Sequence, residues 1–463
     1  MNGGEFVMFL GIDIGTTAIK FAVIADGKIK FQQTSPVRTY RDQQICYQRA
    51  TELLEVLKVG VQSIPKDMRE ALETVSFSVA MHSILPWGEG LDDAIYIWSD
   101  TQAEQTIATF KQQERASLFY QRTGTPIHAM SPFTKLLYFQ QQNRYPNHTH
   151  YYGIKELIMH YFTGEFVLDY ATASATGLFD LQERQWDAEI LAFVGISAQQ
   201  LAPLVDTTTS FPLKERAAVE LKIPVTAKVV IGASDGCLAA YASYIATGIP
   251  NSLTIGTSAS VRKVTKEPTF DSGKQNFCYY LNETYYVTGA PSNNGGCVLE
   301  WASHLYADTP QEFFENLPSA LQHSPIGANG LRFEPYINGE RAPLWQNEVT
   351  GTLKNIRIQH TKNDMIRSVV EGILFNIRTL TEMVHVTEKL SLSGGFFKSE
   401  MLRKMTADVL GVDCYLSDYN EPIMGLYYLI YGQQSTAVPI ETIASSQEQY
   451  EHYTEVFKNY FSK

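Results

Sequence analysis

The sequence has few cysteines, and they are widely spaced. Its 463 residues contain five, which form no C-x-x-C pair: Cys46, Cys237, Cys278, Cys297 and Cys414. An odd number of scattered cysteines argues against a disulfide framework, and the lack of close pairs argues against a zinc site. Such cysteine usage is typical of a reducing compartment, so a cytoplasmic location is expected.

Long apolar runs and an excess of positive charge are also missing. No run of about 18 apolar residues occurs, so no membrane span is expected. Lys and Arg number 37 against 49 Asp and Glu, a formal net charge of -12, which leaves no surplus of cations to bind a phosphate backbone. The first ten residues lack the basic flank of a secretory signal. The expected partners are therefore small molecules, with neither nucleic acid nor membrane among them.

The common nucleotide and metal motifs are absent as well. The chain contains no G-x-x-x-x-G-K-[ST] loop, no G-x-G-x-x-G fingerprint and no H-E-x-x-H helix. Its 44% hydrophobic and 19% charged residues indicate a globular protein, and its length predicts two domains. Strand and helix patterns alternate throughout, which favours the α/β class. The turn-forming residues 247–251 indicate a boundary that divides the chain into residues 1–245 and 246–463.

Two similar turns stand out, one near the start of each half. Residues 6–17 and residues 253–258 are each an apolar strand that ends in Gly-Thr followed by a hydroxyl residue. A hairpin bent at glycine exposes backbone N–H groups and hydroxyls at its tip. One such turn is typical of an ordinary hairpin, whereas the repetition predicts a pair of phosphate-facing turns. Their candidate phosphate-binding residues are Gly15, Thr16, Thr17, Gly256, Thr257 and Ser258.

A third glycine-bent segment lies near the C-terminus. Residues 361–384 predict a helix capped by Thr361, and residues 389–393 predict a short strand. Gly394 and Gly395 then make a turn before a helix that begins at Ser399. A strand–Gly-Gly–helix unit can bring its backbone close to a flat or anionic ligand.

Two aspartates could carry chemistry. Asp235 follows a β-branched strand and stands among small residues, where a carboxylate could accept a hydroxyl proton as the oxygen attacks a phosphoryl group. The alternative is a turn aspartate that caps the following helix. Asp13, beside the first glycine-bent turn, could hold Mg²⁺ through water. The alternative is an ordinary polar residue at a hairpin tip.

Polar and aromatic residues at strand ends could line a substrate pocket. Met81 and His82 follow one predicted strand, and Trp98 and Asp100 follow another. A histidine can bond a hydroxyl while a tryptophan packs on the carbon face of a polyol. Residues 123–135 form a loop whose prolines make it rigid enough for a pocket wall, with His128 and Lys135 as polar anchors. Structural roles, or a plain surface connection, are the alternatives.

Taken in order, these motifs resemble the FGGY carbohydrate kinases of the actin-like ATPase superfamily, over essentially the whole chain. The first and second glycine-bent turns are similar to the two phosphate motifs of the family, residues 393–399 to its adenosine-side loop, and Asp235 to its catalytic base. Residues 339–343, Gly-Glu-Arg-Ala-Pro, are similar to another characteristic stretch. The resemblance implies an α/β fold of two actin-like (ribonuclease H-like) domains with an interdomain cleft. The first domain would bind the sugar, and the second would bind most of the ATP.

The resemblance also implies roles for particular residues. ATP and Mg²⁺ are the expected cofactors, with Asp13 at the metal and Asp235 as the base. Because members of the family are often dimers, a homodimer is among the expectations. Besides the two turns, the implied nucleotide-binding residues are Gly295, Gly394, Gly395 and Phe396. The implied substrate-binding residues are Met81, His82, Trp98, Asp100, His128, Lys135 and Asp235.

Within the family, the likeness is greatest to members that phosphorylate gluconate, through residues 78–83, 123–128, 290–296 and 299–301. D-gluconate is therefore the expected substrate, and Lys135 and His128 are the candidate cations for its carboxylate. One departure is Gln102, where the family usually has arginine in Trp-x-Asp-x-Arg. Kinases of xylulose, glycerol or another polyol remain alternatives, as do an ATPase and a non-catalytic sugar- or nucleotide-binding regulator on the same fold.

Overall fold

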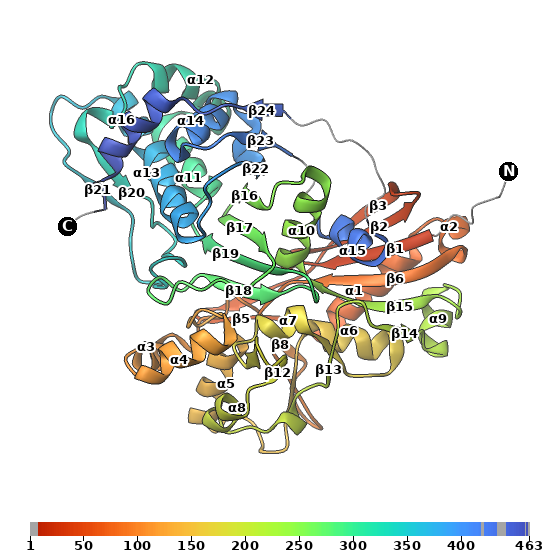
Figure 1. Ribbon diagram of the computed structural model, residues 1–463. Coiled ribbons are helices and arrows are strands. Elements are labelled where there is room, and N and C mark those ends of the chain that lie inside the picture. The colour runs from red at the N-terminus through yellow and green to blue at the C-terminus, as the bar shows by residue number, and fades with distance from the viewer. Residues whose placement is uncertain (1–7, 418–420, 433–440, 459, 462–463) are drawn as a thin grey trace.

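Two large mixed β-sheets, each flanked by helices, form the framework of the protein (Figure 1). The computed structural model describes residues 8–417, 421–432, 441–458 and 460–461, so Phe6 and Val7 of the first predicted strand lie outside the described residues. The first sheet has the strand order β14-β15-β6-β1-β2-β3, and the second has the order β18-β19-β17-β16-β22-β23-β24. This arrangement confirms the predicted two-domain α/β fold.

In the first sheet, the strands β1, β6 and β15 run parallel to one another. Strands β2 and β3 continue from β1 as antiparallel hairpins, because tight turns need antiparallel neighbours. The helices α1 and α6 pack on this sheet, and α9 packs against both of them. The bounds are β1 (Met8–Ile14), β2 (Ala18–Ala25), β3 (Lys28–Pro36), β6 (Leu72–Val79), β14 (Ser210–Pro212), β15 (Lys228–Ser234), α1 (Ala50–Gln62), α6 (Ile154–Thr163) and α9 (Glu215–Leu221).

In the second sheet, β16, β22 and β23 are parallel, and the hairpin β16–β17 repeats the form of β1–β2. The predicted helix over 361–384 is confirmed as α13 (Lys362–Met383), which begins with a capping box between Thr361 and Asp364. The strand bounds are β16 (Asn251–Ile255), β17 (Ala259–Thr265), β18 (Phe277–Tyr280), β19 (Tyr286–Ser292), β22 (Leu390–Ser393), β23 (Cys414–Leu416) and β24 (Glu441–Ile443).

One helix lies between the two sheets. This helix, α10 (Asp235–Thr247), contacts β6 and β15 of the first sheet as well as β16 and β17 of the second. The helix α15 (Pro422–Tyr431) packs against α10 and onto β1 and β6, so a segment from the second half of the chain covers the sheet of the first half (Figure 1). The predicted division at residues 245 and 246 falls at the end of α10 and stays a prediction.

The register of the strands decides which residues meet. Asp13 on β1 and Ala233 on β15 both pair with Ser78 on β6, so the carboxyl ends of these three parallel strands lie side by side. In the second sheet Thr254 pairs with Ser393, which brings the ends of β16 and β22 together. Because ligands of open α/β sheets bind outside the carboxyl ends of strands, these two edges are where a site is expected.

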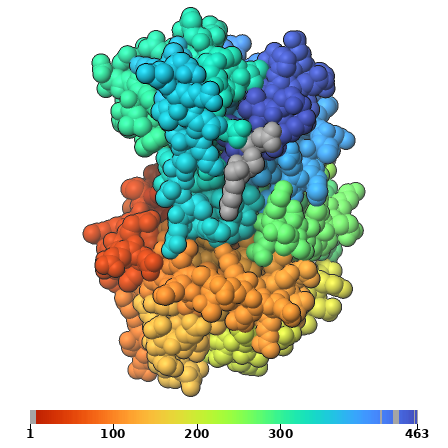
Figure 2. Space-filling model, turned by 90° about the vertical axis from the view of Figure 1, so that its left-hand side faces the viewer, coloured from red at the N-terminus to blue at the C-terminus, as the bar shows by residue number. Residues whose placement is uncertain are grey.

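The two halves also meet away from α10. On the face drawn in Figure 2, cyan residues of the upper half contact orange residues of the lower half. Lys111 Nζ donates a hydrogen bond of 2.6 Å to the carbonyl of Trp345 across this junction, and Asn347 contacts Glu104. Within the part of the chain that the structure describes, no helix is long and apolar enough to span a membrane.

Candidate active site

Asp235 stands where β15 ends and α10 begins, between the two sheets. Its Oδ1 accepts a hydrogen bond of 2.7 Å from the N–H of Gly236. The N-cap position belongs to Ser234, so Asp235 is the first residue of the helix and does not cap it. Burial raises the pKa of Asp235, while the charge of Arg262 opposes that rise. A carboxyl group with a raised pKa accepts a proton more readily than an ordinary one, as a general base should.

Asp13 lies on β1, which β6 separates from β15, and is close enough to Asp235 for the two carboxylates to interact by charge. Its Oδ1 accepts a hydrogen bond of 2.6 Å from the hydroxyl of Ser78, and the residue is only 7% exposed. Burial and the nearby Asp235 carboxylate raise the pKa of Asp13 to about 7. Two carboxylates in one buried place are unfavourable without a cation nearby. Their oxygens are ligands of the kind that Mg²⁺ prefers.

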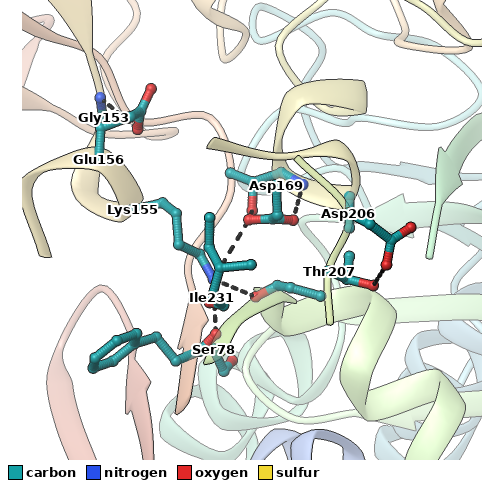
Figure 3. Close-up of polar contacts among 12 residues, drawn as sticks. Ser78, Gly153, Lys155, Glu156, Asp169, Asp206, Thr207 and Ile231 are labelled. Atoms are coloured by element: carbon teal, nitrogen blue, oxygen red, sulfur yellow. Dashed lines mark hydrogen bonds and ion pairs between the residues drawn. The ribbon is translucent and has the colours of Figure 1, made fainter. Parts of the chain in front are cut away.

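A buried lysine fixes the strand end that carries Asp235 (Figure 3). The strand β15 bulges between Val230 and Ala233, where Gly232 has a φ of 75°. Lys155 Nζ donates hydrogen bonds of 2.7 Å to the carbonyls of Phe77 and Ile231. The ammonium group also lies 3.5 Å from the carboxylate of Asp169, and both side chains are fully buried. Lys155 therefore holds β6 and β15 together just before Asp235.

Replacing Lys155 by Met is expected to lower the free energy of unfolding by about 3–5 kcal/mol, because Asp169 would stay buried without its cation. Urea unfolding followed by circular dichroism measures the change. The matched control is Lys58→Met, since Lys58 pairs with partly exposed Glu55 and Glu220. Because solvent screens these two ion pairs, Lys58→Met is expected to change the stability far less than Lys155→Met. Equal destabilisation by the two variants would contradict the structural role of Lys155.

A small cavity of about 150 Å³ opens beside Asp235. Four predicted substrate-binding residues line it, which are Met81, His82, Trp98 and Asp235, together with Thr16 of the first glycine-bent turn. Five further lining residues were not predicted. These are Ala80, Met130, Gly236, Arg262 and Arg341.

His82 and Trp98 are held in fixed orientations at this cavity. His82 has a φ of 68°, an unusual conformation for a residue with a side chain, which is often found at functional sites. Its Nδ1–H donates a hydrogen bond of 2.7 Å to the carbonyl of Ala175, so Nε2 is left as an acceptor. Burial lowers the pKa of His82 to about 3, so the ring is neutral. Trp98 Nε1 donates a hydrogen bond of 2.9 Å to the hydroxyl of Thr16.

The other three predicted substrate-binding residues do not line this cavity. Asp100 accepts hydrogen bonds from the N–H of Cys46 at 2.9 Å and from Gln102 at 2.7 Å. Lys135 donates to the carbonyls of Ala129 and Met130. His128 accepts a hydrogen bond of 3.3 Å from the N–H of Met130. These contacts support the wall of the site, and direct contact with a ligand stays a prediction for all three residues.

Two arginines that sequence reasoning did not select face the cavity. Arg262 lies in β17 next to a second charged residue, Lys263, so the local sequence pattern did not distinguish it. Arg341 lies in the Gly-Glu-Arg-Ala-Pro stretch, which resemblance had noted without assigning its arginine a role. The guanidinium of Arg341 donates a hydrogen bond of 3.0 Å to the carbonyl of Ser292, and its carbon lies 5.5 Å from the centre of the Trp98 ring.

The two glycine-bent turns form as predicted. The N–H of Gly15 donates a hydrogen bond of 3.0 Å to the carbonyl of Ala18. The N–H of Gly256 donates a hydrogen bond of 2.9 Å to the carbonyl of Ser258. The helix α11 (Gly296–Tyr306) begins against the second turn, where the N–H of Gly296 donates to Gly256 at 2.7 Å. A β-carbon on Gly295 would lie 2.7 Å from the backbone of Ser258, so glycine is needed for this close packing.

A larger cavity, of about 770 Å³, lies between helical segments of the second half of the chain, next to Gly395 and Phe396. Gly394 has a φ of 104°, and a β-carbon there would lie 2.3 Å from the carbonyl oxygen of Ile255. Only glycine therefore allows the end of β22 to approach β16. The cavity walls are mostly apolar and its size is that of a small-molecule site. It is lined by Leu299, Phe314, Pro318, Gly395, Phe396, Lys398, Ser399, Glu400, Met401, Leu402 and Lys404.

The chain is similar to known sugar kinases over most of its length. A curated gluconokinase of Bacillus subtilis (strain 168) is 33% identical over 447 residues, covering 90% of this chain and 87% of that protein. The crystal structure of a gluconate kinase from Lactobacillus acidophilus covers 98% of this chain and 97% of its own, with a TM-score of 0.89 and 26% identity. A ligand-bound xylulose kinase from Lactobacillus acidophilus covers 98% of this chain and 96% of its own, with a TM-score of 0.90 and 26% identity.

The family comparison covers both halves of the chain. The N-terminal domain of the FGGY family of carbohydrate kinases matches residues 8–242, and its C-terminal domain matches residues 251–424. The residues between the two matches, 243–250, include the end of α10. The chain therefore belongs to the FGGY family of carbohydrate kinases.

Proposed function

We propose that this carbohydrate kinase transfers the γ-phosphate of ATP to the terminal hydroxyl of D-gluconate, giving 6-phosphogluconate and ADP. The observation that carries the proposal is the small cavity, in which Asp235 shares its walls with His82, Trp98 and two arginines. An aromatic face and a neutral histidine suit a polyol, and the arginines suit an acid. The likeness to gluconokinase and gluconate kinase supports the same substrate.

Asp235 acts as the general base in the proposed reaction. Its carboxylate accepts the proton of the terminal hydroxyl while that oxygen attacks the γ-phosphorus. The bond between the γ-phosphorus and the bridging oxygen breaks, and ADP leaves with the electron pair. The raised pKa of Asp235 favours this proton transfer. His82 Nε2 can accept a hydrogen bond from a substrate hydroxyl, and Trp98 can pack on the carbon chain.

The phosphates of ATP are proposed to lie between the two glycine-bent turns. The backbone N–H groups of Thr16, Thr17, Thr257 and Ser258 would face them, as predicted from the sequence. Asp13 is the residue that would hold Mg²⁺, which when bound supplies positive charge against the phosphate oxygens.

The larger cavity beside Gly394, Gly395 and Phe396 is proposed to bind the adenosine. In this proposal the second half of the chain binds the nucleotide and the first half binds the sugar. The ranges predicted for these two roles are 246–463 and 1–245. Closing the two halves around both substrates would exclude water from the reacting phosphate.

A xylulose kinase is the second candidate, because the xylulose kinase structure overlays this fold as well as the gluconate kinase structure does. A coupled assay of ADP release with D-gluconate, D-xylulose and glycerol separates the candidates. We expect D-gluconate to give the highest kcat/KM. Preference for xylulose or glycerol would overturn the substrate assignment. ADP release without any sugar would indicate an ATPase, and no release at all would indicate a non-catalytic regulator.

The pH dependence tests the role of His82. With a pKa of about 3, His82 stays neutral above pH 5 and cannot supply the acid limb of the kcat/KM profile. His82→Gln is therefore expected to lower kcat/KM by about tenfold through one lost hydrogen bond, while the acid limb keeps its position. Rates at pH 5 to 9 measure this, with the exposed His323→Gln as control. An acid limb that disappears in His82→Gln would contradict the assignment.

The cytoplasmic location and the homodimer stay predictions. All five cysteines lie within the described residues and are free. Light scattering of the purified protein would determine the oligomeric state.

A further inference from the structure

The small cavity contains more positive charge than the proposed phosphoryl transfer requires. Besides Asp235 it is lined by Arg262 and Arg341, which approach from the second half of the chain. We propose that Arg262 and Arg341 together bind the carboxylate of the sugar acid and make the enzyme select acids over neutral polyols. This inference rests on the proposed function and deepens it by naming the residues that determine the substrate class.

Arg262 has guanidinium N–H groups without hydrogen-bond partners among the described residues. It extends from β17 over the start of α10, where its Nε would lie 3.7 Å from a β-carbon placed on Gly236. Across the described ranges, its guanidinium has neither a hydrogen bond nor an ion pair within 4 Å, and the charge of Asp235 acts on it from a greater distance. A guanidinium carries five N–H donors, and leaving them unpaired in a partly buried place is unfavourable. Such a group is matched to a ligand that accepts hydrogen bonds and carries negative charge.

Arg341 is held in place but is also incompletely paired. One Nη donates to the carbonyl of Ser292, and the group packs near the Trp98 ring. Its buried Nε has no hydrogen-bond partner among the described residues. Burial lowers the pKa of Arg341 to about 10; the charge of Glu340 opposes this shift, and the charge of Arg262 adds to it. The two cations therefore repel each other, and an anion bound between them would remove this repulsion.

Among the described residues, the nearby carboxylate of Glu340 acts on Arg341 by its charge but makes neither a hydrogen bond nor an ion pair with the guanidinium. Its oxygens accept hydrogen bonds from the hydroxyl of Ser292 at 2.7 Å, the N–H of Asn293 at 2.9 Å and the amide of Asn376 at 2.8 Å. Glu340 is fully buried and is not a lining residue of the cavity. The free donors of the two arginines thus remain available to a ligand.

The cations predicted from the sequence are poorly placed for this role. Lys135 is fully buried and donates to the carbonyls of Ala129 and Met130. Burial lowers the pKa of His128 to about 3, so this histidine is neutral. Arginine forms two parallel hydrogen bonds with a carboxylate, which neither lysine nor a neutral histidine can do. A neutral polyol would leave these donors unpaired, which is how a polar site rejects the wrong substrate.

The test compares two ligands that differ only at the proposed contact. D-glucitol has the carbon chain and stereocentres of D-gluconate, with a CH₂OH group in place of the carboxylate. In calorimetric titrations, Arg262→Met is expected to bind D-gluconate about 10- to 100-fold more weakly than the wild type. D-glucitol, even if it binds weakly, should bind both proteins alike, and so should Mg·ADP. Arg262→Lys should recover part of the lost affinity. The exposed Arg216→Met serves as the matched control.

Three outcomes of these titrations would overturn the inference. Unchanged gluconate affinity in Arg262→Met would overturn the inference, as would equal losses for gluconate and glucitol. A loss of Mg·ADP affinity would overturn it too, because Arg262 would then serve the phosphates. Failure of the proposed function is separate, since it is seen when the wild type does not phosphorylate D-gluconate. In that case another sugar acid and its matching alditol test the arginine pair in the same way.

Discussion

Replacing Asp235 by Asn is expected to lower kcat by about 10²- to 10⁴-fold, the usual contribution of a general base. Asparagine has nearly the same shape, so the cavity is preserved, but its amide cannot take the proton of the attacking hydroxyl. The affinity for D-gluconate should change little, because the side chain is needed in the transition state more than in the bound complex. Steady-state rates give kcat, and calorimetry gives the affinity.

The matched control for this variant is Asp26→Asn. Asp26 is exposed at the turn between β2 and β3 with a φ of 55°, a conformation that asparagine also accepts. The control should keep the activity of the wild type. A rate for Asp235→Asn within a factor of a few of the wild type would refute the assignment of the base.

Replacing Gly256 by Val is expected to weaken the binding of Mg·ADP by at least about tenfold, which is 1.4 kcal/mol. A β-carbon on Gly256 meets no protein atom within 4 Å, and the backbone there does not require glycine. The fold should therefore accept valine, while its methyl groups occupy the space proposed for phosphate. Calorimetric titration with Mg·ADP measures the loss.

The exposed Gly273→Val makes the same change away from the turn, where a β-carbon would meet only Asp271 at 3.4 Å. Thermal unfolding should show that both glycine variants are folded. Nucleotide affinity equal to the wild type in Gly256→Val would place the phosphates somewhere other than this turn.

Local features of the site could be predicted from the sequence. The hairpins around Gly15 and Gly256 and the capping box of Thr361 depend on residues a few positions apart, and the structure contains all of them. Asp235 could also be singled out, because an aspartate after a buried strand and among small residues is a local pattern. In each case, the residues that predict the feature are close neighbours in the sequence.

Features that depend on distant parts of the chain could not be predicted. Lys155 looks like an ordinary helix lysine until β6 and β15 surround its ammonium group. The direction of the Lys135 side chain could not be read from the sequence either; in the structure its ammonium group donates to the carbonyls of Ala129 and Met130, and substrate contact stays a prediction. Arg262 comes from β17 in the second half, and only the fold brings it beside Asp235.

A crystal structure of the protein with D-gluconate and a non-hydrolysable ATP analogue would test the central claim most directly. The account predicts that the terminal hydroxyl lies about 2.6–3.2 Å from a carboxylate oxygen of Asp235 and points to the γ-phosphate. A gluconate bound with its terminal hydroxyl away from Asp235, or a γ-phosphate far from the turns at Thr16 and Thr257, would contradict it.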